Sequence, residues 1–406
     1  MIGPNSSPTE PTEPSPSVSS PSPSPSPFPS PSPSPFPSPS PSPAAPPAAG
    51  IVPNSSPQAA TASPSMSSST PLTVLVTGAS GFLGQYVVAA ALRQGYRVRA
   101  VVRPASNLAK ISWGNHPQLE PVRLDLRSSR GLAEALQGVA GVIHLAAVKG
   151  GDFYDRFAGT VIATENLLTA MAQTQVSRLV AISTFSVYGY QQIRPGSRLT
   201  EDSPLERNPL DRDYYAQTKL IQEDLIRQYE AQRQSAVTIL RPGMIYGREC
   251  LWHALLGAEL SETHWLKVGG GAVLPMIYVE NCAEAIVLAV EAQDSIGQTV
   301  NLVDDACPTQ NQYIQGLLRH DPTPPKLTPV PWWLVRGIGG LAWWVNQRLL
   351  GGQARLPSIL VPAQLEARFR SLRFPNDRAK SLLHWTPRYS LESALDRSYS
   401  DYDLLS

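Results

Sequence analysis

Short apolar runs alternate with helix-forming stretches along the chain from residue 72 onward. Residues 72–77 predict a buried strand because the run is short, rich in β-branched residues and stopped by a glycine. Residues 84–94 favour a helix that stops at Gly95, and residues 96–102 favour a second strand, which completes a strand–helix–strand unit. The alternation predicts further strands at 122–126, 142–146, 178–183 and 237–240, and helices around 132–136, 160–172 and 215–231. The pattern indicates an α/β fold with a Rossmann-type, doubly wound parallel sheet covered on both faces.

The first 71 residues have a different composition from the rest of the chain. They contain 23 of the 41 prolines and only two charged residues, Glu10 and Glu13. Between Pro21 and Pro43 proline nearly alternates with serine, which fixes φ at every second residue and removes backbone donors. We therefore expect residues 1–71 to form a disordered or extended tail. It is either dispensable, or a tether or ligand for a proline-binding module.

Charge and cysteine content narrow the function classes. The 33 Lys and Arg residues nearly balance the 32 Asp and Glu residues, which argues against nucleic acid as a partner. Cys250, Cys282 and Cys307 are odd in number and far apart, so we expect free thiols in a reducing compartment and no metal site. The amino terminus has no basic region followed by an apolar run, so a cytoplasmic location is the default expectation.

Three glycines directly follow the first predicted strand. Gly78, Gly81 and Gly84 have the spacing that allows a tight turn, close approach of the backbone to a pyrophosphate and close packing of helix on strand. The amino terminus of the following helix offers free N–H groups to the anion. This segment, with Ser80, Phe82 and Leu83 between the glycines, predicts the phosphate-binding turn of a dinucleotide cofactor.

The residue after the second predicted strand is Arg103, where the adenosine ribose is expected. A carboxylate would accept hydrogen bonds from a ribose 2′-hydroxyl, whereas a guanidinium pairs with a 2′-phosphate. The sequence therefore favours NADP, with NAD as the alternative if Arg103 is only a solvated loop residue. Lys110, or the pair Ser106 and Asn107, offers further donors, and Asp125 is expected to accept from the adenine amino group.

The candidate catalytic residues are Thr184, Tyr215 and Lys219. Tyr215 and Lys219 lie four residues apart in a predicted helix, so their side chains share one face. A neighbouring ammonium stabilises a phenolate, and we expect Lys219 to lower the pKa of Tyr215 toward the working pH. Thr184 follows the predicted strand at 178–183 and should emerge at the carboxyl edge of the sheet, where ligands bind. Its hydroxyl would hold a substrate oxygen against Tyr215.

These motifs, in this order, resemble the extended short-chain dehydrogenases/reductases over nearly all of residues 72–402. The matching segments are TGASGFLG at 77–84, DL at 125–126, HLAA at 144–147, ST at 183–184, VYG at 187–189, Tyr215 with Lys219, and RPGMIYG at 241–247. The resemblance implies that Thr184, Tyr215 and Lys219 are catalytic and that Lys219 also holds the nicotinamide ribose. It further implies cofactor contacts at Leu126, Ala146, Ala147, Pro242 and Gly243. Thr160 stands where the family usually has asparagine, which puts the role of that asparagine near Lys219 in doubt.

Within this family, residues after the active-site threonine separate the reaction types. Dehydratases resembling this chain have Asp-Glu there, and Phe185 and Ser186 lack the acid and base needed for water elimination. The 241–247 segment is similar to that of the 3β-hydroxysteroid dehydrogenase and dihydroflavonol reductase branch. The leading hypothesis is an oxidoreductase that interconverts a hydroxyl and a ketone on a hydrophobic, steroid-, flavonoid- or terpenoid-like molecule. A nucleotide-sugar epimerase with a tightly bound cofactor, and a non-catalytic cofactor-binding scaffold or redox sensor, are the alternatives.

The carboxyl-terminal region is expected to bind the substrate. We assign residues 72–242 to the cofactor-binding core, to which 276–303 returns, and residues 243–275 and 304–406 to a smaller, discontinuous substrate-binding region. Four of the eight tryptophans lie within residues 332–344 and are expected to belong to the core or to line a hydrophobic substrate pocket or lid. Residues 331–350 are interrupted by Arg336, Arg348 and several glycines, which argues against a membrane span. A helix lying on a membrane surface and an oligomer contact, such as a homodimer, are the other interpretations of this segment.

Overall fold

The computed structural model describes residues 71–108, 111–261, 263–351, 353–354 and 356–405. The predicted tail at 1–71 lies almost entirely outside the described residues, and so does Lys110. All described residues belong to one unit of the chain, Ser68–Ser406.

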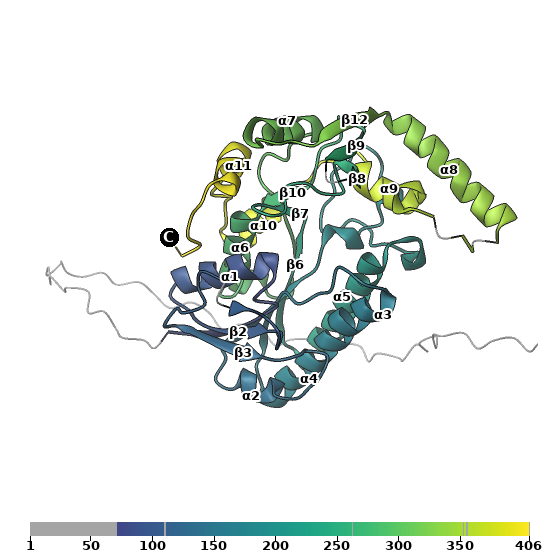
Figure 1. The fold of residues 1–406 in the computed structure, drawn as a ribbon. Helices are drawn as coiled ribbons and strands as arrows, with labels where there is room; N and C mark the ends of the chain where they lie inside the picture. The colour runs from purple at the N-terminus through teal and green to yellow at the C-terminus, as the bar shows by residue number, and fades with distance from the viewer. Residues whose placement is uncertain (1–70, 109–110, 262, 352, 355, 406) are drawn as a thin grey trace, which may run out of the picture. The chain divides into compact units, whose positions relative to one another are not determined.

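Seven parallel strands form the main sheet in the order β11-β6-β5-β4-β1-β2-β3 (Figure 1). The strands are β1 (Thr73–Thr77), β2 (Arg97–Val102), β3 (Leu119–Arg123), β4 (Gly141–His144), β5 (Arg178–Ile182), β6 (Ala236–Pro242) and β11 (Thr299–Leu302). The chain runs outward from β1 to β3 and then from β4 to the opposite edge, which is the doubly wound arrangement. The predicted Rossmann-type α/β sheet is therefore confirmed.

The core lies on both faces of this sheet because successive strand residues point to opposite sides. In β1, Val74 and Val76 join the cluster that includes α1 (Phe82–Arg93) and α6 (Val279–Leu288). Leu75 joins the cluster that includes α2 (Leu132–Leu136), α4 (Ala163–Thr174) and α5 (Tyr214–Arg233). Burial on both faces explains why these strands are apolar runs in the sequence and do not alternate with polar residues.

Two predicted elements differ from the structure in position. The third strand is β3 at Leu119–Arg123, so the prediction of 122–126 was wrong by three residues at each end. This strand lies at the edge of the sheet, where Glu120 and Pro121 are exposed, and no apolar run marks its start. The predicted helix at 160–172 is α4 at Ala163–Thr174, preceded by α3 (Phe153–Arg156) and a π-helical segment, Phe157–Ile162.

The remaining elements lie mostly after β6. β7 (Met244–Tyr246) pairs with β10 (Met276–Tyr278), and β9 (His264–Val268) lies between β8 (Gly257–Ser261) and β12 (Lys326–Val330). The carboxyl-terminal helices are α7 (Gln310–His320), α8 (Trp332–Leu349), α9 (Pro362–Phe369), α10 (Asp377–Leu383) and α11 (Leu391–Tyr399). Segment 276–303 supplies α6 and β11 to the main sheet layer. Among the described helices, none has the length and apolarity that crossing a membrane requires.

Candidate active site

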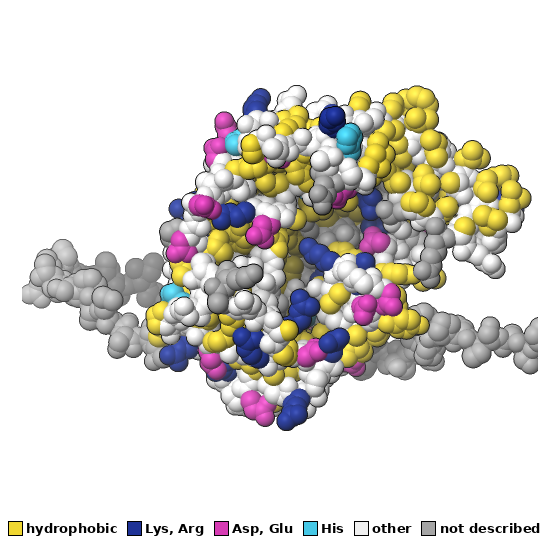
Figure 2. Space-filling view, in the orientation of Figure 1, with side chains coloured by type: hydrophobic (Ala, Val, Ile, Leu, Met, Phe, Trp, Pro, Cys, Tyr) yellow, Lys and Arg dark blue, Asp and Glu magenta, His cyan; other side chains and the backbone are white. Residues whose placement is uncertain are grey.

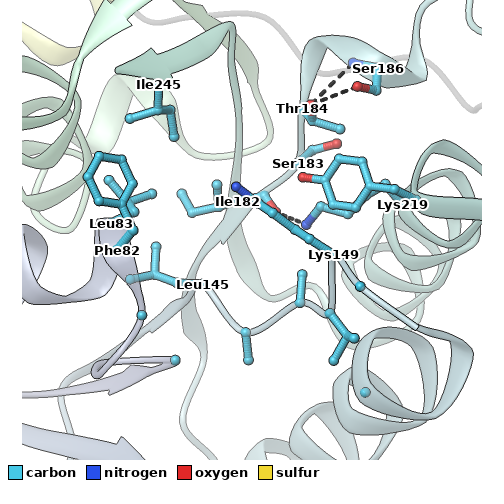
Figure 3. A pocket seen from close by; sticks show the side chains of 18 of the residues that line it. Phe82, Leu83, Leu145, Lys149, Ile182, Ser183, Thr184, Ser186, Lys219 and Ile245 are labelled. Carbon is cyan, nitrogen blue, oxygen red and sulfur yellow. Dashed lines mark hydrogen bonds between the residues drawn. The ribbon is translucent and has the colours of Figure 1, made fainter. Parts of the chain in front are cut away.

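A cleft with a volume of ≈ 1020 Å³ runs along the carboxyl ends of the parallel strands. It brings together the three candidate catalytic residues and most of the candidate cofactor-binding residues, whereas Ser106 and Asn107 do not line it. The candidate residues that line it are Gly78, Ser80, Gly81, Phe82, Leu83, Gly84, Arg103, Asp125, Leu126, Ala146, Ala147, Thr184, Tyr215, Lys219, Pro242 and Gly243. Figure 3 shows Thr184 and Lys219 on one side of the cavity and Phe82, Leu83 and Ile245 on the other.

Two glycines of the turn between β1 and α1 are required by the backbone geometry. Gly78 adopts φ +68°, in the left-handed region, and a Cβ there would lie 3.1 Å from the backbone of Ala146. A Cβ at Gly84 would lie 2.1 Å from the carbonyl oxygen of Gly78. The turn is therefore as tight as a phosphate-binding turn needs to be, and the amino terminus of α1 lies at the cleft.

Two arginines lie at the end of the cleft where the adenosine ribose is expected. Arg103 is exposed, and its side chain makes no hydrogen bond with any described residue. Its loop is held by Arg123, which donates to the carbonyl oxygens of Pro104 (2.7 Å) and Ser106 (2.9 Å). The carboxylate of Asp125 accepts from Arg127, which lowers the pKa of Asp125. Arg127, which the sequence analysis missed, thus adds a second exposed guanidinium beside Arg103.

Thr184 and Tyr215 meet in the cleft from different elements. Thr184 follows β5 and caps a short 3₁₀ helix, where its Oγ1 accepts from the backbone N–H of Ser186 (3.2 Å; Figure 3). Tyr215 is the second residue of α5, whose amino terminus is capped by Asp213. Burial raises the pKa of Tyr215 to about 12, and the neighbouring hydroxyl of Thr184 partly offsets that increase. The two hydroxyls that were predicted to flank a substrate oxygen are therefore adjacent.

Lys219 lies one helical turn beyond Tyr215 and is buried. Its Nζ donates to the carbonyl oxygen of Ile182 (2.6 Å) and to Oε1 of Gln222 (2.6 Å). Burial lowers the pKa of Lys219 to about 7. We predicted that Lys219 lowers the pKa of Tyr215, and in this structure that prediction was wrong. Burial removes water from the phenol of Tyr215, and this desolvation raises its pKa more than the neighbouring groups lower it.

A buried chain of polar groups connects Lys219 to the strand that carries the glycine turn. Gln222 Nε2 donates to Thr164 Oγ1 (2.8 Å), which lies 2.9 Å from Nε2 of His144, and His144 Nδ1 lies 2.8 Å from Thr77 Oγ1. Burial lowers the pKa of His144 to about 3, so the imidazole is neutral. Lys219 and Gln222 are three residues apart, but the links of this network that join α5, α4, β4 and β1 span 20 to 78 residues and have no local sequence pattern.

Thr160, which replaces the usual asparagine, lies in the π-helical segment and is buried. Its Oγ1 accepts from the backbone N–H of Val148 (3.1 Å), and Thr164 donates to its carbonyl oxygen (2.6 Å). In this chain, therefore, the side chain that contacts Lys219 is Gln222 of α5.

A buried ion pair fixes α5 against β6. Arg241 donates to the carboxylate of Glu223, and Ser183 Oγ donates to Glu223 Oε2 (2.7 Å). The guanidinium carbon of Arg241 lies 4.9 Å from the ring centre of Tyr188, whose hydroxyl accepts from Arg241 (3.0 Å). Two of the motifs that carry the resemblance, at 187–189 and 241–247, thus position the strand end that bears Thr184.

With this geometry described, the comparisons with known proteins identify the family. Residues 74–302, which are more than half of the chain, match the NAD dependent epimerase/dehydratase family. The chain belongs to this family. The resemblance to extended short-chain dehydrogenases/reductases is thereby confirmed, and the chain is an NAD(P)-dependent enzyme of that type.

Individual relatives in the epimerase/dehydratase family have different names. The chain is 26% identical over 329 residues to a 4-hydroxy-2-methyl-3-oxo-4-farnesyl-3,4-dihydroquinoline-1-oxide ketoreductase from Stigmatella aurantiaca, covering 79% of this chain and 94% of that protein. It is 26% identical over 360 residues to the human sterol-4-alpha-carboxylate 3-dehydrogenase, decarboxylating, covering 80% and 87%. A UDP-glucuronic acid 4-epimerase structure from Bacillus cereus in complex with NAD superposes with a TM-score of 0.60 at 22% identity, covering 81% and 97%. That structure shows the shared fold.

The cleft is also lined by the turn after β5, by segments after β6 and by α9. Its apolar side chains there include Phe185, Met244, Ile245 and Leu255, and Ala367 and Arg368 come from α9. Lys149, which the sequence analysis missed, is exposed and makes no hydrogen bond or ion pair with any residue that the structure describes. Figure 3 shows its side chain within the cavity.

The tryptophans of residues 332–344 do not line the cleft, so the prediction of an aromatic substrate pocket from them was wrong. Trp332 packs against Phe369 with ring centres 5.5 Å apart, while Trp333 and Trp344 are exposed. The apolar character of this segment is visible in the sequence, but the direction in which each face of the helix points is not.

Proposed function

We propose that the protein transfers hydride between NADP and a hydroxyl or ketone carbon of a hydrophobic small molecule, with Tyr215 as acid and base. The observation that carries the proposal is that Thr184, Tyr215 and Lys219 line the same cleft as the glycine turn. The names of two relatives, a farnesyl quinoline-oxide ketoreductase and a sterol-carboxylate dehydrogenase, support this substrate class.

The residues of the cleft suit such a reaction. A bound nicotinamide cofactor supplies or accepts the hydride at the substrate carbon. In the direction of reduction, Thr184 holds the carbonyl oxygen and Tyr215 gives its phenolic proton to that oxygen, which forms the alcohol. Lys219 lies one helical turn from Tyr215 on α5. Because its pKa is lowered to about 7, its side chain gains or loses a proton near neutral pH. The buried network through Gln222 and His144 keeps Lys219 oriented.

The first test is Tyr215→Phe, measured with a panel of sterol, flavonoid-like and terpenoid ketones by the change in NADPH absorbance. We expect turnover to fall by about 10²–10⁴-fold, because a positioned proton donor is lost, with cofactor binding unchanged. Tyr214→Phe is the matched control, since Tyr214 is the adjacent, exposed tyrosine and does not line the cleft. Equal turnover of Tyr215→Phe and the starting protein would refute the role of Tyr215.

NADP selectivity is tested separately through Arg103. The guanidinium of Arg103 lines the cleft and makes no hydrogen bond with a described residue, whereas Arg127 is already paired with Asp125, so Arg103 is the cation that a 2′-phosphate would meet there. We expect NADPH to bind about 10-fold or more tightly than NADH, and Arg103→Ala to abolish most of the difference. Arg97→Ala, at the other end of β2, is the control. Equal affinity of the starting protein for both cofactors would reject NADP preference.

A nucleotide-sugar epimerase is the second candidate. Lys149, Arg212 and Arg368 line the cleft, and such cations suit the diphosphate of a nucleotide sugar. However, Arg212 is already paired with Glu206 (3.3 Å), and apolar side chains line the same cleft. The substrate panel separates the two candidates, since an epimerase converts UDP-sugars with no net oxidation of added NADPH and keeps its cofactor bound through purification.

A further inference from the structure

Helix α8 has apolar residues on two opposite faces. The inward face contains Val335, Gly339 and Asn346, which are buried against α9 and the 358–360 turn. The outward face includes Trp333 and Trp344, which are 72% and 55% exposed. Five more large apolar residues of this helix and its end are also exposed: Leu334, Ile338, Leu341, Leu349 and Leu350.

The outward residues form one continuous stripe. Positions 333, 334, 337, 338, 341, 344 and 345 recur at the three- and four-residue spacing of one helix face. Figure 2 shows hydrophobic side chains gathered over this helix at the upper right, where Figure 1 places α8. An apolar stripe along 18 residues, roughly 27 Å of helix, is larger than a soluble monomer usually leaves in water.

Positive charge predominates in the sequence of this segment. No Asp or Glu occurs between Asp321 and Glu366, whereas Arg336, Arg348 and Arg355 do. Arg336 is paired with Glu366 of α9 (3.6 Å), and Arg348 is exposed and forms no salt bridge with a described residue. Contact between two copies of α8 would bring Arg348 near a second helix that contains no acidic residue. The positive charge and the apolar stripe would both be complemented by a surface that carries fixed negative charges and accepts apolar side chains between them. Tryptophan is also enriched at the boundary between lipid headgroups and acyl chains.

We propose that the outward face of α8 lies on the surface of an anionic phospholipid bilayer. The helix is parallel to that surface, since no described helix is long and apolar enough to span a membrane. α8 packs against α9, whose Gln364, Ala367 and Arg368 line the cleft. The assignment of α8 does not depend on the proposed oxidoreductase activity.

The test is flotation of the full chain with vesicles of phosphatidylcholine containing 30% phosphatidylglycerol. We expect binding to these vesicles, weaker binding to phosphatidylcholine alone, and a loss of about tenfold or more in the partition coefficient for Trp333→Gln/Trp344→Gln. Arg348→Gln should weaken binding about fivefold, with less dependence on salt than the starting protein shows. The control is Tyr154→Gln/Leu210→Gln, which removes two side chains of 79% and 88% exposure outside α8 and should bind like the starting protein.

Three results would overturn the assignment to a bilayer. The first is failure of the starting protein to float, or equal flotation of the two double variants. The second is a lipid-free dimer, seen by light scattering, that Trp333→Gln/Trp344→Gln dissociates, because the stripe would then be covered by a second copy. The third is vesicle binding only after deletion of residues 1–70, which would assign the stripe to the amino-terminal segment in the full chain.

Discussion

α5 and α8 are the two longest helices that the structure describes, and they depart from the usual distribution of polar and apolar residues in opposite ways. α5 buries charged and amide side chains, among them Lys219, Gln222 and Glu223. α8 exposes tryptophan, leucine and isoleucine. Every buried group named in α5 has a hydrogen-bond or ion-pair partner inside the protein, whereas the outward face of α8 has none. Polar side chains of a helix can be buried where hydrogen-bond and ion-pair partners from the same protein surround them. An apolar helix face that stays exposed instead indicates a binding partner outside the molecule.

The largest effect on stability is expected from Glu223→Gln. Loss of the carboxylate leaves the buried guanidinium of Arg241 without its counter-charge, so the free energy of unfolding should fall by about 3 kcal/mol. Asp224→Asn, at the adjacent exposed position, should change it by less than about 0.5 kcal/mol. Urea unfolding of both variants measures the difference. Similar stability of the two would mean that α5 does not depend on its buried partners.

A smaller, pH-dependent effect is expected for Lys219→Met. The pKa of Lys219 is about 7 in the folded protein and 10.5 ordinarily. Between pH 7 and pH 10.5 the unfolded chain therefore binds one more proton at Lys219 than the folded protein does. For this reason the free energy of unfolding rises as the pH rises through this range. Relative to Lys219→Met, the starting protein should therefore gain stability above pH 7, by at most about 1.4 kcal/mol per pH unit. Urea unfolding at pH 7, 8 and 9 measures this gain. The control is Lys326→Met at an exposed site, whose free energy of unfolding should vary with pH as that of the starting protein does. If the free energy of unfolding of Lys219→Met also followed the starting protein, the lowered pKa of Lys219 would be contradicted.

The smallest effect on stability is expected for Trp333→Gln/Trp344→Gln. These side chains are already largely exposed, so replacing them should change the free energy of unfolding by less than about 0.5 kcal/mol per site. Thermal or urea unfolding without lipid checks this. A loss above about 2 kcal/mol would show that the outward face of α8 packs inside the protein, and the contrast with α5 would disappear.

The cofactor half of the site was predictable from local sequence because its residues are contiguous or directly follow apolar strands. The glycine turn at 78–84 follows β1, Arg103 follows β2, and Thr184 follows β5, and parallel strands bring such ends to one edge. Lys149 and Arg127 also follow strands, so their positions gave a signal that the sequence analysis did not use. His144 belongs to a recognised motif and Gln222 is three residues from Lys219, but their contact across 78 residues has no local pattern.

The sequence by itself determined the strand–helix alternation, the tight turn at Gly78 and the order of motifs that places the chain in its family, since each depends on neighbouring residues. Only the tertiary structure decided that burial raises the pKa of Tyr215, that Gln222 contacts Lys219, and that the tryptophans of α8 point away from the cleft. The physical reason is that desolvation and hydrogen-bond partners depend on which distant segments surround a side chain, and a linear pattern of residues does not contain that information.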